Sequence, residues 1–379
     1  MNILTVNIGG SSSKLGFHPA NQPHEAVLHT YESDLSNEDV CSRLQGFLEG
    51  KTQAIDAICH RIVHAGPFHT EPQLITTDVI SAIEEHTDIA PNHNPQALVW
   101  IRACEKLFSA SIPQFAVFDT GYFNCLPEVA SRYAVPSEFA KRRLGFHGLA
   151  HQCMQDFVKD KTASHIEDTR VISLQLGSGC SVTASIGGRP IDTSMGYSPL
   201  EGLVMATRSG DIDPGLLLHL MKKSQVSPKE LERVLYQRSG LLGLSGETGD
   251  MDALLNLNSP DAKLAVEIFC YRIKKYVGAY MAAMGGVDWI IFSGGIGENA
   301  PSIRAKVLED MDWFGIALDS DINNSTYGTA SEINLPDQIV KIAVVSCEEN
   351  ALMARLTRQM QHKPPHITTQ HTLSGGIHG

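Results

Sequence analysis

Two turns rich in glycine and serine, each lying between two apolar strands, constrain the fold of this chain most strongly. The segment NILTVNIGGSSSKLGF begins at residue 2, and VISLQLGSGCSVTASIGG begins at residue 171. Each pattern is typical of a strand, a tight turn and a second strand. The repeat lies near the start and the middle of the chain, so it predicts two similarly built halves whose turns face each other across a cleft.

The rest of the chain alternates between apolar runs and helical periodicity, which is the pattern of an α/β protein. The clearest predicted strands are Ile3–Val6, Ala57–Val63, Phe115–Phe118, Val171–Leu176, Trp289–Phe292 and Ile339–Val345. The predicted helices are Asn94–Phe108, Gly148–Val158, Lys229–Tyr236, Asp261–Met284, Pro301–Met311 and Glu349–Met360.

Charge and cysteine usage exclude several classes of protein. The 379 residues carry 42 acidic and 30 basic side chains, a net charge of −12, so binding to nucleic acid is not expected. No run approaches the roughly 20 apolar residues that span a bilayer, and the first residues lack a basic, apolar signal peptide. The 8 cysteines include no CxxC pair, which favours reduced thiols and a cytoplasmic protein without a zinc ribbon.

Three loops could hold phosphate groups. They are the segments 9–14, 177–181 and 294–299, each of which follows a predicted strand. Backbone N–H groups in such glycine-rich turns can approach an anion closely, and Lys14 adds charge to the first. A plain hairpin turn explains any one of these loops equally well. Three such loops together favour a phosphate-binding cleft.

Two other motif interpretations compete for the same residues. Residues 295–300 fit the GxGxxA form of a dinucleotide fingerprint, with Asp319 about 20 residues later, as in an NAD-dependent oxidoreductase. That interpretation leaves the other two loops unexplained. His147 and His151 stand four apart, as two zinc ligands on a helix would, but the motif lacks the glutamate of a zinc protease.

Several charged residues adjoin apolar strands, where an unpaired charge is costly. Arg61 lies within the predicted strand 57–63 and therefore needs an anionic partner. Asp119 follows another strand, at the edge where α/β sheets bind ligands, although a turn aspartate is the simpler explanation. The irregular segment 192–214 carries Arg208, four acids and many small residues, which is typical of a functional loop.

With these motifs in order, the chain resembles the acetate kinase family, whose members phosphorylate carboxylates and belong to the actin and hexokinase superfamily. The resemblance runs from Asn7 to about Met353. It is carried by NIGGSSSK (7–14), HRIVHAG (60–66), HNP (93–95), FDT (118–120), GFHG with His151 (145–151), QLGSG (175–179), DTSMGYSPLEGLVMATRSGDIDP (192–214), GGIGEN (294–299) and CEEN (347–350).

The resemblance implies a role for each matching residue. Asp119, His147 and Arg208 would be catalytic, and Asn7 and Glu348 would hold Mg²⁺, with Mn²⁺ as an alternative. Arg61, Val63, Asn92, Phe146 and Pro199 would bind the carboxylate substrate. The nucleotide would contact Lys14, Gln175, Leu176, Gly177, Ser178, Gly179, Asp250, Met251, Asp252, Gly295, Ile296, Gly297, Glu298 and Asn299.

The resemblance also implies an architecture and a reaction. We expect two domains of duplicated ribonuclease H-like fold, as in actin and hexokinase, with a central nucleotide cleft. The first domain would be residues 1–118 with a returning helix 350–361, the second 119–349, and 362–379 a disordered tail. A homodimer would convert ATP and acetate, or another short-chain acid such as propionate or butyrate, into ADP and an acyl phosphate.

Five positions depart from the family pattern. Gly10 replaces a serine of the first loop, and Gln175 and Ser178 replace a histidine and an asparagine of the second. Phe123 replaces a histidine after Asp119. Asn92 replaces a leucine of the apolar pocket, and an unpaired amide there would cost roughly 1–3 kcal/mol, so a polar acid could be favoured.

Overall fold

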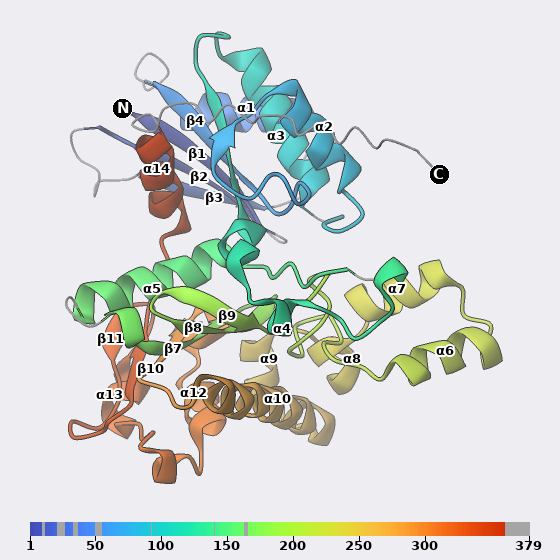
Figure 1. The fold of residues 1–379 in the computed structure, drawn as a ribbon, viewed down its shortest axis with the longest axis vertical. Helices are drawn as coiled ribbons and strands as arrows, with labels where there is room; N and C mark the ends of the chain where they lie inside the picture. The colour runs from blue at the N-terminus through green and yellow to red at the C-terminus, as the bar shows by residue number, and fades with distance from the viewer. Residues whose placement is uncertain are drawn as a thin grey trace, which may run out of the picture.

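The computed structural model describes residues 1–9, 12–20, 27–32, 37–49, 55–91, 93–139, 141–162 and 166–360. Two mixed β-sheets, each covered by helices on both faces, form the two halves of the molecule seen in Figure 1. Gly10, Asn92 and the predicted tail 362–379 lie outside the described residues. No helix within the described ranges is long and apolar enough to cross a membrane.

The first sheet has the strand order β3-β2-β1-β4-β6-β5. Strands β1, β2 and β3 pair antiparallel, β4 and β6 extend the sheet in parallel, and β5 closes the edge antiparallel. Their bounds are β1 (Ile3–Ile8), β2 (Ser12–His18), β3 (Val27–Glu32), β4 (Ala57–Ile62), β5 (Gln73–Leu74) and β6 (Gln114–Phe118).

The second sheet has the order β9-β8-β7-β10-β12-β11. It repeats the first sheet strand for strand: three antiparallel strands, two parallel ones and a short antiparallel edge. Their bounds are β7 (Arg170–Leu176), β8 (Cys180–Ile186), β9 (Arg189–Thr193), β10 (Trp289–Ser293), β11 (Ser331–Glu332) and β12 (Lys341–Val344). The duplicated halves predicted from the repeated strand and turn pattern are thus confirmed.

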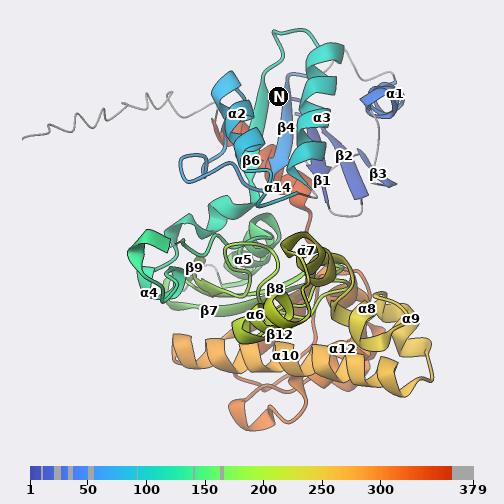
Figure 2. The same cartoon turned by 90° about the vertical axis from the view of Figure 1, so that its right-hand side faces the viewer.

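Alternation along the strands decides which helix covers which face of the first sheet. Leu4, Val6 and Ile8 pack with Trp100 under α1 (Asn37–Phe47) and α3 (Asn94–Leu107). Ile3, Cys59 and Val117 face the other way and pack against α14 (Glu349–Met360). The chain therefore returns to its first sheet at the end of the fold (Figure 2).

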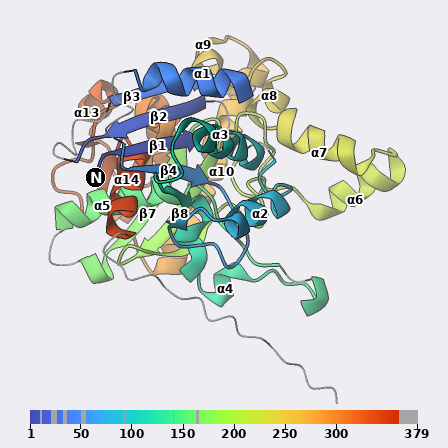
Figure 3. The ribbon, with the colours of Figure 1, turned by 90° about the horizontal axis from the view of Figure 1, so that it is seen from above.

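The second sheet is covered in the same manner. Ile172, Leu174 and Ile290 pack under α10 (Pro260–Met284) and α12 (Pro301–Leu308). Val171 and Ile291 face α5 (Gly148–Thr162), where Met154 and Val158 are fully buried. Because α5 and α14 each cover the inner face of one sheet, they meet between the halves, where Arg355 of α14 pairs with Asp156 of α5 (Figure 3).

All six predicted strands and all six predicted helices are present, with ends shifted by a few residues. The elements whose bounds have not yet been given include α7, which matches the predicted helix Lys229–Tyr236. They are α2 (Thr77–Glu85), η2 (Asp119–Cys125), α4 (Glu128–Ser131), η3 (Ser137–Phe139), η4 (Ile166–Asp168), α6 (Pro214–Lys223), α7 (Pro228–Gln237), α8 (Gly240–Ser245), α9 (Met251–Asn256), α11 (Gly294–Asn299), η5 (Asp312–Phe314) and α13 (Ser320–Ser325).

Candidate active site

Arg61 stands at the centre of a buried polar network at the end of the first sheet. Its Nη2 donates to Oδ2 of Asp119 at 3.1 Å, and its Nη1 donates to Oδ1 of Asn7 at 3.1 Å and to Oε2 of Glu349 at 3.5 Å. The side chain is buried, yet the charges of Asp119 and Glu349 outweigh burial and raise the pKa of Arg61. The anionic partners expected for Arg61 therefore include two carboxylates of the protein itself, those of Asp119 and Glu349.

Asp119 joins this network to the second half of the molecule. It begins η2 directly after β6, and its carboxylate accepts hydrogen bonds from the backbone N–H of His147 at 2.7 Å and of Leu149 at 3.4 Å. Burial alone would raise the pKa of Asp119, but Arg61 and His147 hold it below the usual value. Asp119 is thus an ionised, oriented carboxylate at the start of α5.

His147 sits just before α5 with a left-handed backbone, at a φ of +60°. Its Nδ1 lies 2.9 Å from Oγ of Ser181, which also lies 2.8 Å from Nε2 of His151. Burial, together with the charges of Arg61 and Arg208, lowers the pKa of His147 to about 4 despite the nearby Asp119. Without a bound anion the imidazole is neutral at pH 7.

Arg208 is a half-buried cation without a carboxylate partner among the described residues. Its Nη1 donates to the carbonyl oxygen of Pro199 at 2.8 Å, and burial lowers its pKa. A β-carbon on Gly179 would lie 2.6 Å from Nη2 of Arg208 and 3.3 Å from Nε2 of His147. The structure thus brings Arg208, His147 and the second glycine loop to one point.

The second and third glycine loops lie side by side because β7 and β10 are parallel neighbours, with Gln175 opposite Ser293. A β-carbon at Gly177 would lie 3.9 Å from the backbone nitrogen of Gly295. Gly294 has a φ of +81°, and a β-carbon there would lie 2.5 Å from the carbonyl oxygen of Leu176. This contact requires glycine at the turn from β10 into α11, which contains all five predicted nucleotide contacts from Gly295 to Asn299.

The predicted segment Asp250–Asp252 opens α9. Asp250 caps this helix by accepting from the backbone N–H of Ala253 at 2.8 Å, while Met251 is buried and Asp252 is exposed. The preceding Gly249 packs against the carbonyl of Ala206, whose N–H donates to Ser178 at 3.1 Å. This segment is therefore one step from the second glycine loop.

The remaining charged candidates lie around Asn7. Lys14 is exposed on β2, directly opposite Asn7 of β1. Glu348 is exposed just before α14. Its neighbour Glu349 instead makes the inward contact, where Oε2 accepts from Nδ2 of Asn7 at 2.7 Å.

The apolar candidates gather as expected. Val63 and Phe146 are buried in one hydrophobic cluster, and buried Pro199 is tied to Arg208 through its carbonyl. Asn92 lies outside the described residues. Phe123 is fully buried, 5.9 Å from the ring of His151, and leaves no room for a β-carbon at Gly145.

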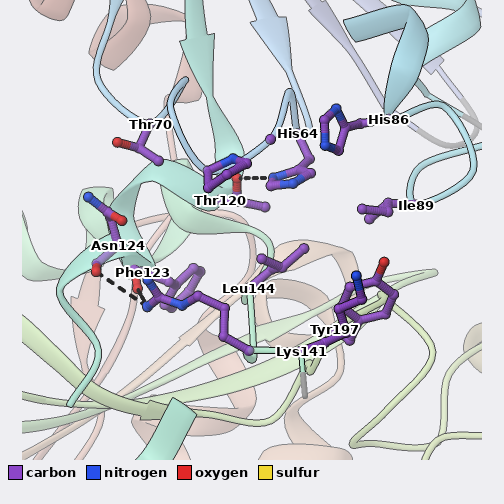
Figure 4. A pocket seen from close by; sticks show the side chains of 13 residues that line it. His64, Thr70, His86, Ile89, Thr120, Phe123, Asn124, Lys141, Leu144 and Tyr197 are labelled. Atoms are coloured by element: carbon purple, nitrogen blue, oxygen red, sulfur yellow. Dashed lines mark hydrogen bonds between the residues drawn. The ribbon is translucent and has the colours of Figure 1, made fainter. Parts of the chain in front are cut away.

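A cavity of about 240 Å³ lies beside these residues, between the two halves (Figure 4). His64, His86 and Ile89 line it from the first half, and Leu144 and Tyr197 from the second. His64, which bonds Thr120 at 3.0 Å, follows Val63, and Thr120 follows Asp119 in sequence. The cavity thus adjoins the predicted acid pocket, and none of the predicted site residues that the structure describes lines it.

Sequence reasoning missed three residues at this site. The motif-based assignment names Glu348 as a metal ligand and does not name Glu349. It includes His93 only as part of the HNP segment. Burial, with the charges of Arg61 and Arg208, lowers the pKa of His93 to about 3. Fully buried Arg304 holds the end of α11, donating to the carbonyls of Gly297 at 2.9 Å and Glu298 at 3.0 Å.

Neither rival motif interpretation fits these contacts. The carboxylate of Asp319, which a dinucleotide would need, caps α13 by accepting from the N–H groups of Asp321 and Ile322 at 3.0 Å. Both ring nitrogens of His151 bond serine hydroxyls, so His151 has no free nitrogen for a metal ion.

Known proteins match this sequence over nearly the whole chain. The sequence profile of the acetokinase family matches residues 3–355. An acetate kinase from Solibacter usitatus is 44% identical over 320 residues, covering 82% of this chain and 77% of that protein.

Solved structures agree with the fold. The crystal structure of an acetate kinase from Porphyromonas gingivalis is 34% identical, with a TM-score of 0.82, and the match covers 95% of this chain and 99% of that one. A propionate kinase from Francisella tularensis is 33% identical, with a TM-score of 0.84, covering 94% and 98%.

Proposed function

The chain belongs to the acetokinase family, a family of phosphotransferases with a carboxyl group as acceptor, and from this we propose that its cleft transfers the γ-phosphoryl group of ATP to acetate. The carboxylate oxygen would attack phosphorus while the bond to the bridging oxygen of ADP breaks, and the reverse reaction would make ATP from acetyl phosphate. The proposed catalytic residues are Asp119, His147 and Arg208.

One observation supports this proposal most strongly. Arg208 is half-buried beside His147 and a glycine loop, and no described carboxylate neutralises its charge. A guanidinium that is partly withdrawn from water and has no carboxylate partner favours a bound anion. In phosphoryl transfer, negative charge spreads over the equatorial oxygens, so donors at this point would stabilise the transition state more than the bound substrates.

The acceptor needs no general base. A carboxylic acid with a pKa of about 4 is already ionised at pH 7. Asp119 is itself ionised and holds both Arg61 and the N-terminus of α5. We therefore assign it to positioning and to the metal, and we assign Arg61, Val63, Phe146 and Pro199 to the acid.

The residues around Asn7 fit a magnesium ion. Asn7, Asp119 and Glu349 converge on Arg61 and offer only oxygen donors, as a hard cation prefers. Mg²⁺ is usually held by one or two carboxylates, waters and substrate phosphates, so two carboxylates suffice. When bound, the ion would neutralise phosphate charge. We propose that Glu349 takes part with Asn7, in addition to or in place of Glu348.

Propionate is the second candidate acid. The structural similarity to a propionate kinase favours it, and the cavity next to Val63 leaves space near the acid pocket. We further propose a cytoplasmic homodimer.

An acid panel tests the activity. Purified protein with MgATP receives acetate, propionate, butyrate, lactate or glycolate, and hydroxylamine traps any acyl phosphate. We expect most hydroxamate from acetate. Preference for another acid would keep the mechanism and change the substrate. No hydroxamate from any acid, with MgATP binding demonstrated by calorimetry, would refute the proposal.

A matched pair of variants tests the acid site. Arg61→Ala should raise the KM for acetate and leave the affinity for ATP nearly intact, because a bidentate guanidinium is lost. Arg102→Ala, which removes an exposed ion pair with Glu84 on another face, should change neither value.

A further inference from the structure

The face of β8 that α5 covers is lined with hydroxyl groups. Ser181, Thr183 and Ser185 alternate along this strand and are fully buried. A buried hydroxyl is costly unless it forms hydrogen bonds, so a row of them in place of apolar side chains requires an explanation.

Four side chains form a continuous chain of hydrogen bonds, here called the histidine–serine relay: half-buried His147 and fully buried Ser181, His151 and Ser173. Ser181 Oγ lies 2.9 Å from His147 Nδ1 and 2.8 Å from His151 Nε2. His151 Nδ1 lies 2.7 Å from Ser173 Oγ. The last hydroxyl donates to the carbonyl oxygen of Thr183 at 3.4 Å.

The far end of the relay sets the direction of every bond in it. A carbonyl oxygen can only accept, so the Ser173 hydroxyl spends its one proton on Thr183 and must accept from Nδ1–H of His151. Burial lowers the pKa of His151 to about 3, so this ring is neutral and its Nε2 is an acceptor. Ser181 then donates to His151 and accepts from Nδ1–H of His147.

We propose that Ser181, His151 and Ser173 are positioning residues that keep a proton on Nδ1 of His147, so that Nε2 alone faces the reacting phosphoryl group with a free lone pair. Nε2 is the ring nitrogen next to Gly179 and Arg208, and no partner for it occurs in the part of the chain that the structure describes. When an anionic substrate is bound, Nε2 can take up a proton from the solvent buffer, and the resulting imidazolium donates a hydrogen bond from Nε2 to a phosphoryl oxygen. During this step the other proton stays on Nδ1 of His147, which donates a hydrogen bond to Oγ of Ser181.

This inference rests on the proposed function for the role of His147, but its first test does not. In full-length protein labelled with ¹⁵N-histidine, two-bond ¹H–¹⁵N correlation spectra at pH 7.5 distinguish protonated from bare ring nitrogens. His147→Gln and His151→Gln assign the signals. We expect protonated Nδ1 and bare Nε2 for His147. A His147 protonated on Nε2 alone would overturn the proposal, whatever the enzyme does with acetate.

Ser181→Ala then tests the effect on turnover. We expect the Nδ1 preference of His147 to be lost and kcat to fall about 10–100-fold, with the KM values for acetate and MgATP nearly unchanged. Ser185→Ala is the matched control, because it removes a buried hydroxyl two positions further along the same face, bonded to Tyr122 and outside the relay. It should keep kcat and the His147 signal.

Two outcomes of the variants would contradict the relay. One is an unchanged His147 signal and kcat in Ser181→Ala. The other is an equal loss in Ser185→Ala, which would indicate general damage to the packing of α5. If Ser181→Ala does not fold, Ser173→Ala removes the anchor of the relay instead, and the spectrum of the wild-type protein remains decisive.

Discussion

At the scale of single residues, the site is decided by charges that are either compensated or left open. Arg61 is paired with Asp119 and Glu349, whereas Arg208 bonds only the carbonyl of Pro199 among the described partners. The charge of Arg61 is therefore largely compensated within the protein, whereas the charge of Arg208 has no described carboxylate partner.

Removing the guanidinium of Arg208 should slow turnover strongly without unfolding the protein. Arg208→Ala should lower kcat about 10²–10³-fold, as for other lost transition-state donors. The melting temperature of this variant should stay or rise, because a half-buried charge without a carboxylate partner disappears. Steady-state kinetics and thermal unfolding measure both. Arg238→Ala, which breaks an exposed pair with Glu230, is the control, and an Arg208→Ala enzyme of normal kcat would remove Arg208 from the mechanism.

A buried histidine on the same strand as Arg61 should make the fold sensitive to acid. His60 donates from Nε2 to Gln114 at 2.6 Å, its Nδ1 has no partner among the described atoms, and burial lowers its pKa from 6.5 to about 4. Between pH 6.5 and pH 4, His60 is protonated in the unfolded chain and neutral in the folded chain. The titration of His60 therefore leaves the free energy of unfolding unchanged above pH 6.5. As the pH falls towards 4, it lowers the free energy of unfolding by about 3 kcal/mol in total.

Urea unfolding at pH 7 and pH 5 measures this contribution. His60→Gln should narrow the difference in unfolding free energy between the two pH values, whereas the exposed His219→Gln on α6 should leave it as in the wild type. Equal differences in all three proteins would show that His60 is not the responsible group.

At the scale of elements, two glycines have different roles in the turn from β10 into α11, which is predicted to contact the nucleotide. Gly294 allows the backbone conformation of the turn, and Gly295 leaves open space beside it. Gly294 has a φ of +81° and sits against the carbonyl of Leu176, whereas a β-carbon at Gly295 would meet no atom of the described residues within 4 Å. Gly294→Ala should therefore cost about 1–3 kcal/mol of stability. Gly295→Ala should keep the fold and raise the KM for MgATP, because only a bound nucleotide would meet the methyl group.

Denaturant unfolding and MgATP titration of the two variants separate these effects. Equal stabilities would contradict the strain at Gly294. An unchanged KM in Gly295→Ala would place the nucleotide elsewhere.

At the scale of the whole molecule, α14 joins the end of the chain to its beginning. Met353 is fully buried among Ile3, Cys59 and Val117, and the same helix presents Glu349 to Asn7 and Arg61. Met353→Ala should cost about 2–5 kcal/mol and lower activity near the melting temperature. Arg355→Ala, on the exposed side of α14, should have a small effect on melting. Similar melting temperatures for both variants would argue against this packing.

The strands, the glycine turns, the repeated halves and the family signature followed from the sequence alone, because they depend on local periodicity and on short motifs. The predicted boundaries, 1–118 with 350–361 and 119–349, and the assigned site roles stay predictions. Tertiary structure alone decided which acid reaches Arg61, since successive residues at a helix start point about 100° apart and the sequence does not show that Glu349 faces the sheet. It also decided that Arg208 has no carboxylate partner within the described structure, that Ser181 joins His147 to His151, and that Ser173 bonds the other ring nitrogen of His151. These contacts link residues far apart in the chain, and only the pairing of β7 with β8 beneath α5 brings them together.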